Sequence, residues 1–172
     1  RVHQFYLKEM EVGAKTDVDG MMFMDDWGAQ RSLLISPRQW RKIFKPLYQD
    51  YIDLAHQHGK FILMHSDGYI LPLYEHLIEI GVDAINSQLF AMPIEEIAAR
   101  FKGRITFWGE MDRQQILPFG TPDDVRAAVE RVRTALGDPR GGIIGQAEFN
   151  QGYPLENIRA FFEAWWGPPE TP

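Results

Sequence analysis

The clearest chemical signature in the sequence is a histidine and an aspartate two residues apart, His65 and Asp67, at the end of a short apolar run. If that run is a β-strand, both side chains point to one face of the sheet and can reach a common ligand. An imidazole nitrogen and a carboxylate oxygen are both ligands for divalent metal ions. The pair therefore predicts a metal site. The alternative is a hydrogen-bonded histidine followed by a turn that Asp67 begins.

A third ligand for such an ion is Glu148, which follows the last apolar run of the chain. Together with His65 and Asp67 it would leave a coordination position open for a substrate, as catalytic metal sites require. This interpretation needs the ends of separate strands to meet at one rim. The alternative for Glu148 is a solvated carboxylate in a loop.

Three more carboxylates are candidates for catalysis. Glu110 and Asp112 would share one strand face and could act as acid, base or hydrogen-bond acceptor for a substrate, although Asp112 could instead cap the segment that follows it. Asp25 and Asp26 are adjacent, so at most one of them faces the site. We expect it to be Asp26, because this residue has the parity of the two methionines before it in the strand.

Aromatic and amide side chains near the strand ends are candidates for contacting a substrate. They are Trp27, Gln88, Trp108, Gln146 and Phe149. The three aromatic side chains could wall a flat substrate, but aromatic residues at strand ends also serve as core or rim.

Short apolar runs alternate with amphipathic stretches from Gly20 onward, a pattern typical of successive βα units. The predicted strands are residues 21–25, 61–65, 84–88, 105–109 and 141–149. The predicted helices are residues 37–58, 70–80, 93–101, 121–136 and 154–166. Ser36 and Thr121 each place a capping hydroxyl before a proline, and glycines follow several helices, as expected at helix ends.

This rhythm fits either an open doubly wound sheet or a closed barrel. No strand is followed by a glycine-rich phosphate-binding loop of the dinucleotide or nucleotide type. Polar residues follow nearly every strand, and in a barrel those ends converge on one face. We therefore predict an α/β fold of the (β/α)8 TIM-barrel family, with about five carboxy-terminal βα units present.

A complete barrel of this kind has eight strands and about 250 residues. The 172 residues therefore predict a single partial barrel domain, with residues 1–19 as an incoming helix and loop and residues 167–172 as a flexible tail. About three amino-terminal βα units would be missing, and that half of the barrel would be a partner. An isolated half would leave sheet edges open, so it would aggregate or form a homodimer.

The composition of the chain limits which partners and metal ligands can be expected. The net charge is −6 and comes from interspersed carboxylates, so nucleic acid is not an expected partner. No apolar run approaches the roughly 20 residues that span a bilayer, which predicts a cytoplasmic protein with no membrane partner. The chain has no cysteine, so any metal ion would need nitrogen and oxygen ligands.

Several segments, in order along the chain, resemble the uroporphyrinogen decarboxylase superfamily. They are Asp25-Asp26-Trp27-Gly28-x-Gln30 followed by Ile35-Ser36-Pro37, His58-Gly59-Lys60 leading to His65-Ser66-Asp67-Gly68, the run from Leu77 to Asn86, Trp108-Gly109-Glu110-Met111-Asp112, and Pro154-Leu155-Glu156-Asn157-Ile158. The resemblance runs from about Gly20 to Trp166 and implies a TIM barrel. It also implies one of two chemistries: cofactor-free decarboxylation of uroporphyrinogen acetate groups, or zinc-dependent methyl transfer between a corrinoid and a thiol or methylated substrate.

The resemblance favours the methyltransferase branch, in which the strand matching residues 61–68 ends in His-x-Cys-Gly and another cysteine lies near the end of the last strand. Here His65 is retained, while Asp67 stands at the first cysteine position and Glu148 lies in the later region. Oxygen ligands suit a thiolate acceptor less well but still allow activation of an ether, amine or hydroxyl oxygen. The decarboxylases carry a histidine in the last-strand loop, and this chain has none near Glu148.

We therefore predict a metal-dependent methyltransferase-like enzyme. His65, Asp67 and Glu148 would hold a divalent ion, zinc by family resemblance, and a corrinoid protein would dock at the barrel mouth to exchange a methyl group with a small-molecule substrate. The first alternative is a cofactor-free tetrapyrrole decarboxylase, a lyase. The second is a non-catalytic fragment that serves as a binding or assembly module.

Overall fold

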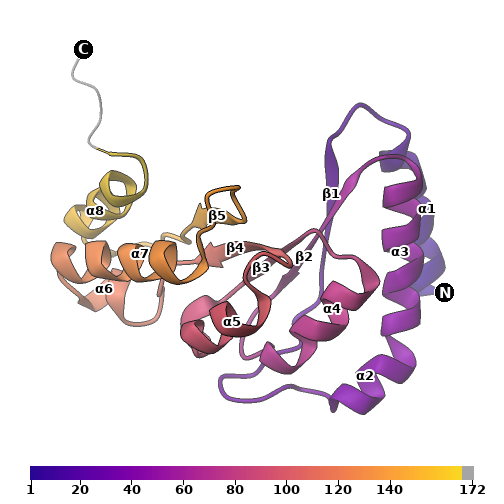
Figure 1. Ribbon diagram of the computed structural model, residues 1–172, viewed down its shortest axis with the longest axis horizontal. Coiled ribbons are helices and arrows are strands. Elements are labelled where there is room, and N and C mark those ends of the chain that lie inside the picture. Colours follow the sequence, from indigo (N-terminus) through magenta and orange to yellow (C-terminus); the bar gives the residue numbers. More distant parts are fainter. Residues whose placement is uncertain (168–172) are drawn as a thin grey trace. The chain divides into compact units, whose positions relative to one another are not determined.

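The structure is a computed structural model that describes residues 1–167, and the chain divides into two compact units, Arg1–Ser87 and Gln88–Pro172. In each unit, parallel strands alternate with helices (Figure 1). The α/β class expected from the sequence is therefore confirmed.

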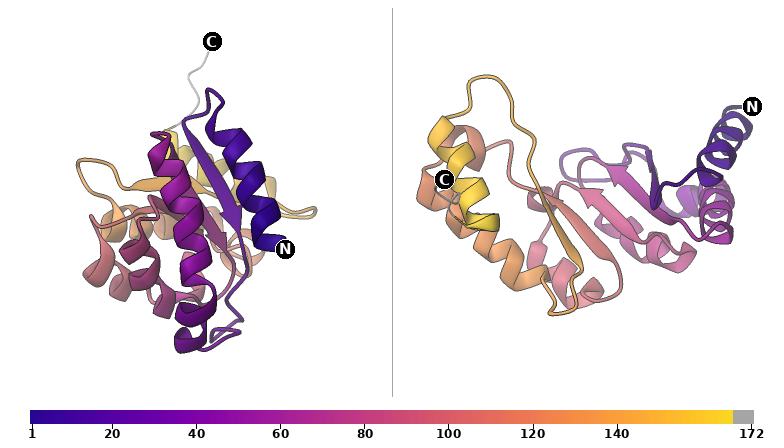
Figure 2. Two further views of the ribbon diagram at one scale, coloured as in Figure 1. Left: turned by 90° about the vertical axis from the view of Figure 1, so that its right-hand side faces the viewer. Right: turned by 90° about the horizontal axis from the view of Figure 1, so that it is seen from above.

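The first unit contains three parallel strands, which pair in the order of the sequence. Its elements are α1 (Val2–Ala14), β1 (Gly20–Met24), α2 (Pro37–Ile43), α3 (Lys45–Gln57), β2 (Phe61–Ser66), the 3₁₀ turn η1 (Leu71–Leu73), α4 (Tyr74–Ile80) and β3 (Ala84–Ser87). Helix α3 packs against both α1 and β2, and α1 and α3 lie side by side in Figure 2. Gly81 ends α4 with φ of 92°, a left-handed conformation that glycine adopts without strain.

The two faces of this sheet differ in burial. Along β2, the side chains of Ile62, Met64 and Ser66 are fully buried on the helix-covered face. His65 points to the opposite face and is only partly buried, and its register neighbour on β1, Met24, is 63% exposed. The polar residues at the ends of β1 and β2 therefore lie beside an open sheet face.

The second unit contains two parallel strands, which pair with Glu110 opposite Gln146. Its elements are η2 (Leu89–Ala91), α5 (Ile94–Phe101), β4 (Thr106–Glu110), α6 (Ile116–Phe119), α7 (Pro122–Leu136), β5 (Ile143–Gln146) and α8 (Leu155–Trp166). Helix α7 packs against both α5 and α8. Its amino terminus has a complete capping box, in which Thr121 and Asp124 each accept a hydrogen bond from the other's backbone N–H.

Three of the expected elements differ from the structure. The helix expected over residues 70–80 begins as the 3₁₀ turn η1, and its α-helical part, α4, starts at Tyr74. The single helix expected over residues 37–58 is wrong, because the chain breaks at Phe44 into α2 and α3. Pro46, in the first turn of α3, has no N–H to continue the hydrogen bonds of α2. The strand expected over residues 141–149 is shorter, since Gly141 and Gly142 have positive φ and form the turn before β5.

Within residues 1–167, no helix has the length and apolar character needed to cross a membrane. The flexible tail expected over residues 167–172 falls, from residue 168 on, outside the described residues.

Candidate metal centre

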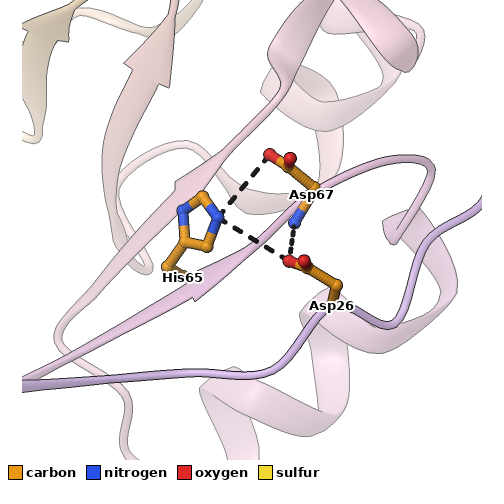
Figure 3. Close-up of side chains that lie close together, drawn as sticks. All are labelled: Asp26, His65 and Asp67. Atoms are coloured by element: carbon orange, nitrogen blue, oxygen red, sulfur yellow. Dashed lines mark hydrogen bonds and ion pairs between the residues drawn. The ribbon is translucent and has the colours of Figure 1, made fainter. Parts of the chain in front are cut away.

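Three side chains meet where β1 and β2 end: Asp26, His65 and Asp67 (Figure 3). The Nε2 atom of His65 lies 3.7 Å from Asp26 Oδ1 and 3.6 Å from Asp67 Oδ1. One ligand atom from each residue falls within 4.8 Å of those of the other two. The structure thus brings His65 and Asp67 together, as their spacing predicts, and adds Asp26 to the pair.

The ring of His65 is oriented by a hydrogen bond on its other side. Its Nδ1 atom lies 2.5 Å from the side-chain oxygen of Asn86 on β3. An amide oxygen can only accept, so this contact fits a ring that carries its proton on Nδ1, and in such a neutral ring Nε2 has a lone pair. The Nε2 atom faces the two carboxylates.

Two glycines allow the loops after β1 and β2 to touch. The N–H of Gly28 donates to the Asp67 carbonyl at 3.2 Å, and the N–H of Tyr69 donates to the Ala29 carbonyl at 2.8 Å. A Cβ atom on Gly28 or on Gly68 would clash with the backbone of the opposite loop. This crossing also brings the backbone N–H of Asp67 within 2.9 Å of Asp26 Oδ1, so the two aspartates are held side by side.

The neighbouring Asp25 points away from the cluster. Its carboxylate accepts a hydrogen bond of 2.5 Å from the hydroxyl of Tyr48 on α3, which in turn accepts from Trp27 Nε1 at 2.8 Å. Burial, and then this bond to a carboxylate, raise the pKa of Tyr48 far above its ordinary value. Tyr48 therefore stays protonated and fixes the loop that carries Asp26.

The donor set fits a divalent cation. Four ligands at about 2.1 Å from an ion in tetrahedral geometry lie about 3.4 Å apart. The distances of 3.6 and 3.7 Å are close to this value and too long for ordinary hydrogen bonds. Two carboxylates and one imidazole suit zinc, manganese or iron(II) better than a soft ion, and two negative charges balance a divalent one.

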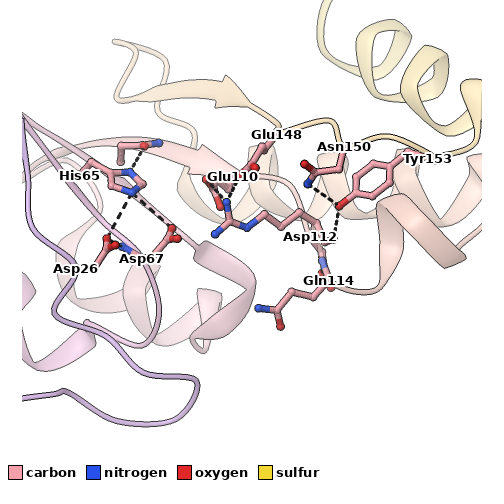
Figure 4. A network of polar contacts seen from close by, with 11 residues as sticks. Asp26, His65, Asp67, Glu110, Asp112, Gln114, Glu148, Asn150 and Tyr153 are labelled. Carbon is pink, nitrogen blue, oxygen red and sulfur yellow. Dashed lines mark hydrogen bonds and ion pairs between the residues drawn. The ribbon is translucent and has the colours of Figure 1, made fainter.

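The second unit has its own cluster of carboxylates, of which Figure 4 labels Glu110 and Glu148. The cation of this cluster comes from the protein itself. Arg113 forms an ion pair with Glu148 and lies 3.6 Å from Glu110 Oε1. Glu110 is only 4% exposed. Glu148, expected as a third metal ligand, thus pairs with a guanidinium in the second unit, and a role as a ligand stays a prediction.

Asp112 caps the chain after β4. Its Oδ1 atom accepts the backbone N–H groups of Gln114 and Gln115, both at 2.9 Å. This is the capping alternative raised by the sequence, and these two bonds point Oδ1 at the backbone. A catalytic role for Asp112 therefore has no further support from its position.

The expected substrate contacts lie in different settings. Trp27 is partly buried, with its ring 4.4 Å from that of Phe44. Phe149 packs on the apolar cluster under α8, where its ring is 5.6 Å from Phe161. Trp108 lies on the same strand face as Glu110 and Gln146, and Gln88 lies at the end of β3 before η2. Their contacts with a substrate stay predictions.

The fold and the cluster are typical of α/β proteins that carry their functional residues at the carboxy ends of parallel strands. A family model described as uroporphyrinogen decarboxylase (URO-D) matches residues 6–166. The chain therefore belongs to the uroporphyrinogen decarboxylase family. No protein among curated sequences matches it.

Solved structures agree on the fold. The chain is similar to a methyltransferase from Methanosarcina mazei, with a TM-score of 0.71 and 15% sequence identity over 94% of this chain and 46% of that one. It is also similar to a dihydropteroate synthetase solved with a product, with a TM-score of 0.54 and 14% identity over 92% of this chain and 60% of that one. The chain thus spans about half the length of the methyltransferase and has the fold of part of a TIM barrel, as the sequence predicts.

Two residues that sequence reasoning did not select contribute to the clusters. Asn86 holds His65, and Arg113 neutralises the carboxylates of the second unit. Asn86 is a polar residue near the end of a buried strand, and this position could have identified it as a candidate site residue. Arg113 had no such signal, because its pairing with Glu148 joins residues far apart in the sequence.

Proposed function

We propose that the chain is part of a metal-dependent, methyltransferase-like enzyme of the uroporphyrinogen decarboxylase family. Asp26, His65 and Asp67 would hold a divalent ion, zinc being the first candidate. The observation that carries this proposal is the convergence of three ligand atoms, one of them the imidazole Nε2 atom of His65, which lies beside two carboxylates. Asp26 takes the place in the ligand set that Glu148 has in the sequence-based hypothesis.

The bound ion would supply Lewis-acid activation of an oxygen atom of the substrate. The protein's own residues prepare the site for this. Asp26 and Asp67 bring two negative charges, and His65 binds as a neutral ligand, so the loaded centre has no net charge. Such a centre favours a neutral oxygen donor, such as an ether or a hydroxyl, over a thiolate.

The methyl group and the corrinoid belong to the proposal through the family resemblance and the methyltransferase whose fold the chain shares. A corrinoid-carrying protein, acting in the cytoplasm, would approach the open sheet face beside His65. Because the chain spans about half of that methyltransferase, the whole enzyme would also need the remaining barrel strands.

A second candidate is a cofactor-free decarboxylase of tetrapyrroles, which the description of the matching family favours. That reaction needs no metal ion. Metal binding therefore separates the two candidates.

The test is calorimetric titration of the metal-free protein with Zn²⁺ and with Mn²⁺. We expect binding of one ion, and we expect Asp67→Asn to weaken it by more than the roughly 10–100-fold that loss of an outer-shell partner costs. Asp17→Asn is the matched control, since it removes the same charge from an exposed aspartate outside the cluster, and it should leave the affinity unchanged.

Absence of binding to the wild-type protein at millimolar ion concentration would exclude the metal-dependent reaction. Equal losses in Asp67→Asn and Asp17→Asn would show that the ions respond only to general negative charge.

A further inference from the structure

Asn86 is not one of the three proposed metal ligands, but its side chain forms a hydrogen bond with His65. We propose that Asn86 is a positioning residue that keeps the proton of His65 on Nδ1, so that Nε2 stays available to a metal ion. This inference rests on the proposed metal centre. It concerns one question, namely which nitrogen of the ring is presented to the carboxylates.

The geometry restricts both partners. His65 on β2 and Asn86 on β3 are register neighbours, so their side chains leave the same face of the sheet. The Nδ1 to Oδ1 distance is 2.5 Å, which is short for a hydrogen bond to an amide. Asn86 is 5% exposed, and the other three residues of β3 are also buried, so the amide has little freedom to turn away.

The chemistry follows from the single proton of a neutral imidazole. If the proton were on Nε2, this nitrogen could not bind an ion, and the N–H would donate to Asp26 or Asp67 instead. Those carboxylates lie at 3.7 and 3.6 Å, beyond hydrogen-bond distance, whereas the Asn86 oxygen lies well within it. The distances therefore favour the Nδ1–H form.

An amide suits this position better than a carboxylate. The cluster already contains two carboxylates, which balance the charge of one divalent ion. A third carboxylate at position 86 would add a negative charge, whereas the asparagine oxygen accepts the same proton without one. Two roles are thus divided among different residues. Asp26 and Asp67 balance the charge of the ion, and Asn86 controls the position of the ring proton.

The test uses long-range ¹H–¹⁵N NMR of the metal-free protein labelled with ¹⁵N-histidine, at about pH 8, where an ordinary histidine with a pKa of about 6.5 is neutral. We expect His65 in the Nδ1–H form. In Asn86→Leu, which is similar in size but cannot accept, the population should move to Nε2–H, and affinity for Zn²⁺ should fall by about 10–100-fold. Asn86→Asp, which keeps an acceptor, should retain the Nδ1–H form.

Ser87→Ala is the matched control, because Ser87 is the next buried residue of β3 and bonds to Tyr74 at 2.7 Å, away from His65. It should change neither the ring proton nor the affinity. An Nε2–H ring in the wild-type protein would overturn the proposal, as would an unchanged ring in Asn86→Leu. If Asn86→Leu fails to fold, Asn86→Ala makes the same test, because alanine also removes the acceptor and adds no bulk.

The same experiment separates the two proposals. If no ion binds while the ring of His65 is in the Nδ1–H form and depends on Asn86, the metal-dependent function fails and the control of the ring proton stands. If an ion binds equally well to Asn86→Leu, the metal centre stands and the role of Asn86 is refuted.

Discussion

Carboxylates gather at strand ends in both units, but they converge on different partners. In the first unit, Asp26 and Asp67 lie beside the Nε2 atom of His65, at distances longer than hydrogen bonds. In the second unit, Glu110 and Glu148 both lie against the guanidinium of Arg113. An arginine side chain is always charged and supplies the positive charge itself. The first cluster could therefore hold a metal ion, whereas the second already contains an internal ion pair.

The backbone around the two clusters differs in the same way. Gly68, which follows Asp67, has φ of 76° and touches the opposite loop so closely that a Cβ atom has no room. Gly152, which follows the strand-end segment of the second unit, has φ of 91° and no atom within 4 Å of the position of a Cβ. The first cluster thus depends on a close contact of loops at Gly68, whereas Gly152 makes no such contact.

The largest expected effect tests this difference. Gly68→Ala should lower the free energy of unfolding by about 4 kcal/mol or more, a loss reserved for severe backbone or packing conflicts. The alanine would both strain a left-handed residue and clash with the backbone of Gly28 and Ala29. Urea denaturation followed by circular dichroism measures the loss.

Gly152→Ala is the control for the backbone conformation alone. It should cost only about 1–2 kcal/mol, the penalty for a residue with a Cβ in the left-handed region. Similar losses for the two variants would mean that the loop crossing contributes little and that the positive φ accounts for both.

The next effect sharpens the contrast between the two charge arrangements. Arg113→Met should destabilise the protein by about 3 kcal/mol, because it leaves the buried carboxylate of Glu110 beside Glu148 without their shared cation. Asp26→Asn should change the stability of the metal-free protein by no more than about 0.5 kcal/mol, since it removes a like charge near Asp67.

Thermal unfolding with and without Zn²⁺ distinguishes the two clusters further. Zinc should stabilise the wild-type protein and Arg113→Met alike, but not Asp26→Asn, because only an ion bound to the native state raises stability. Arg159→Met, an exposed change on α8, is the control and should have no effect beyond about 0.5 kcal/mol. Stabilisation of Asp26→Asn by zinc to the wild-type extent would place the ion elsewhere.

The strands and their polar ends could be predicted from the sequence because they depend on local patterns. All five apolar runs form strands, and the alternation along β1 gives Asp26 a different direction from Asp25. The contact of the loops at Gly28 and Gly68 could not be predicted, because it depends on the packing of two strands against each other. The break at Phe44 was missed although Pro46 signals it, since the apolar period continues through it.

The candidate site shows the same limit. The pair of His65 and Asp67 follows from their spacing on one strand, whereas the partners on neighbouring strands depend on register. Register brings Asn86 beside His65, and tertiary packing brings Arg113 to Glu148. Residue type and spacing therefore identify candidate metal ligands. They do not show which of these carboxylates are already paired with an arginine.

The smallest effect concerns an ion pair between two helices of the second unit, which is exposed to solvent. Arg131 on α7 donates two hydrogen bonds, of 2.7 and 2.8 Å, to Glu95 on α5, and they lower the pKa of Glu95 from 4.5 to about 2. A lowered carboxyl pKa contributes stability above pH 4.5, and this contribution is lost as the pH falls toward 2. Arg131→Met should raise the pKa of Glu95 toward its ordinary value in a ¹³C NMR titration, because it removes the largest of the interactions that lower this pKa. Arg100→Met, which removes the partner of Glu96 on the same helix, should leave the pKa of Glu95 near 2. An equal rise in both variants would mean that general positive charge, and not the paired geometry, holds the Glu95 carboxyl ionised. The exposed pair would then be less specific in its geometry than the pairing of Arg113 with Glu110 and Glu148.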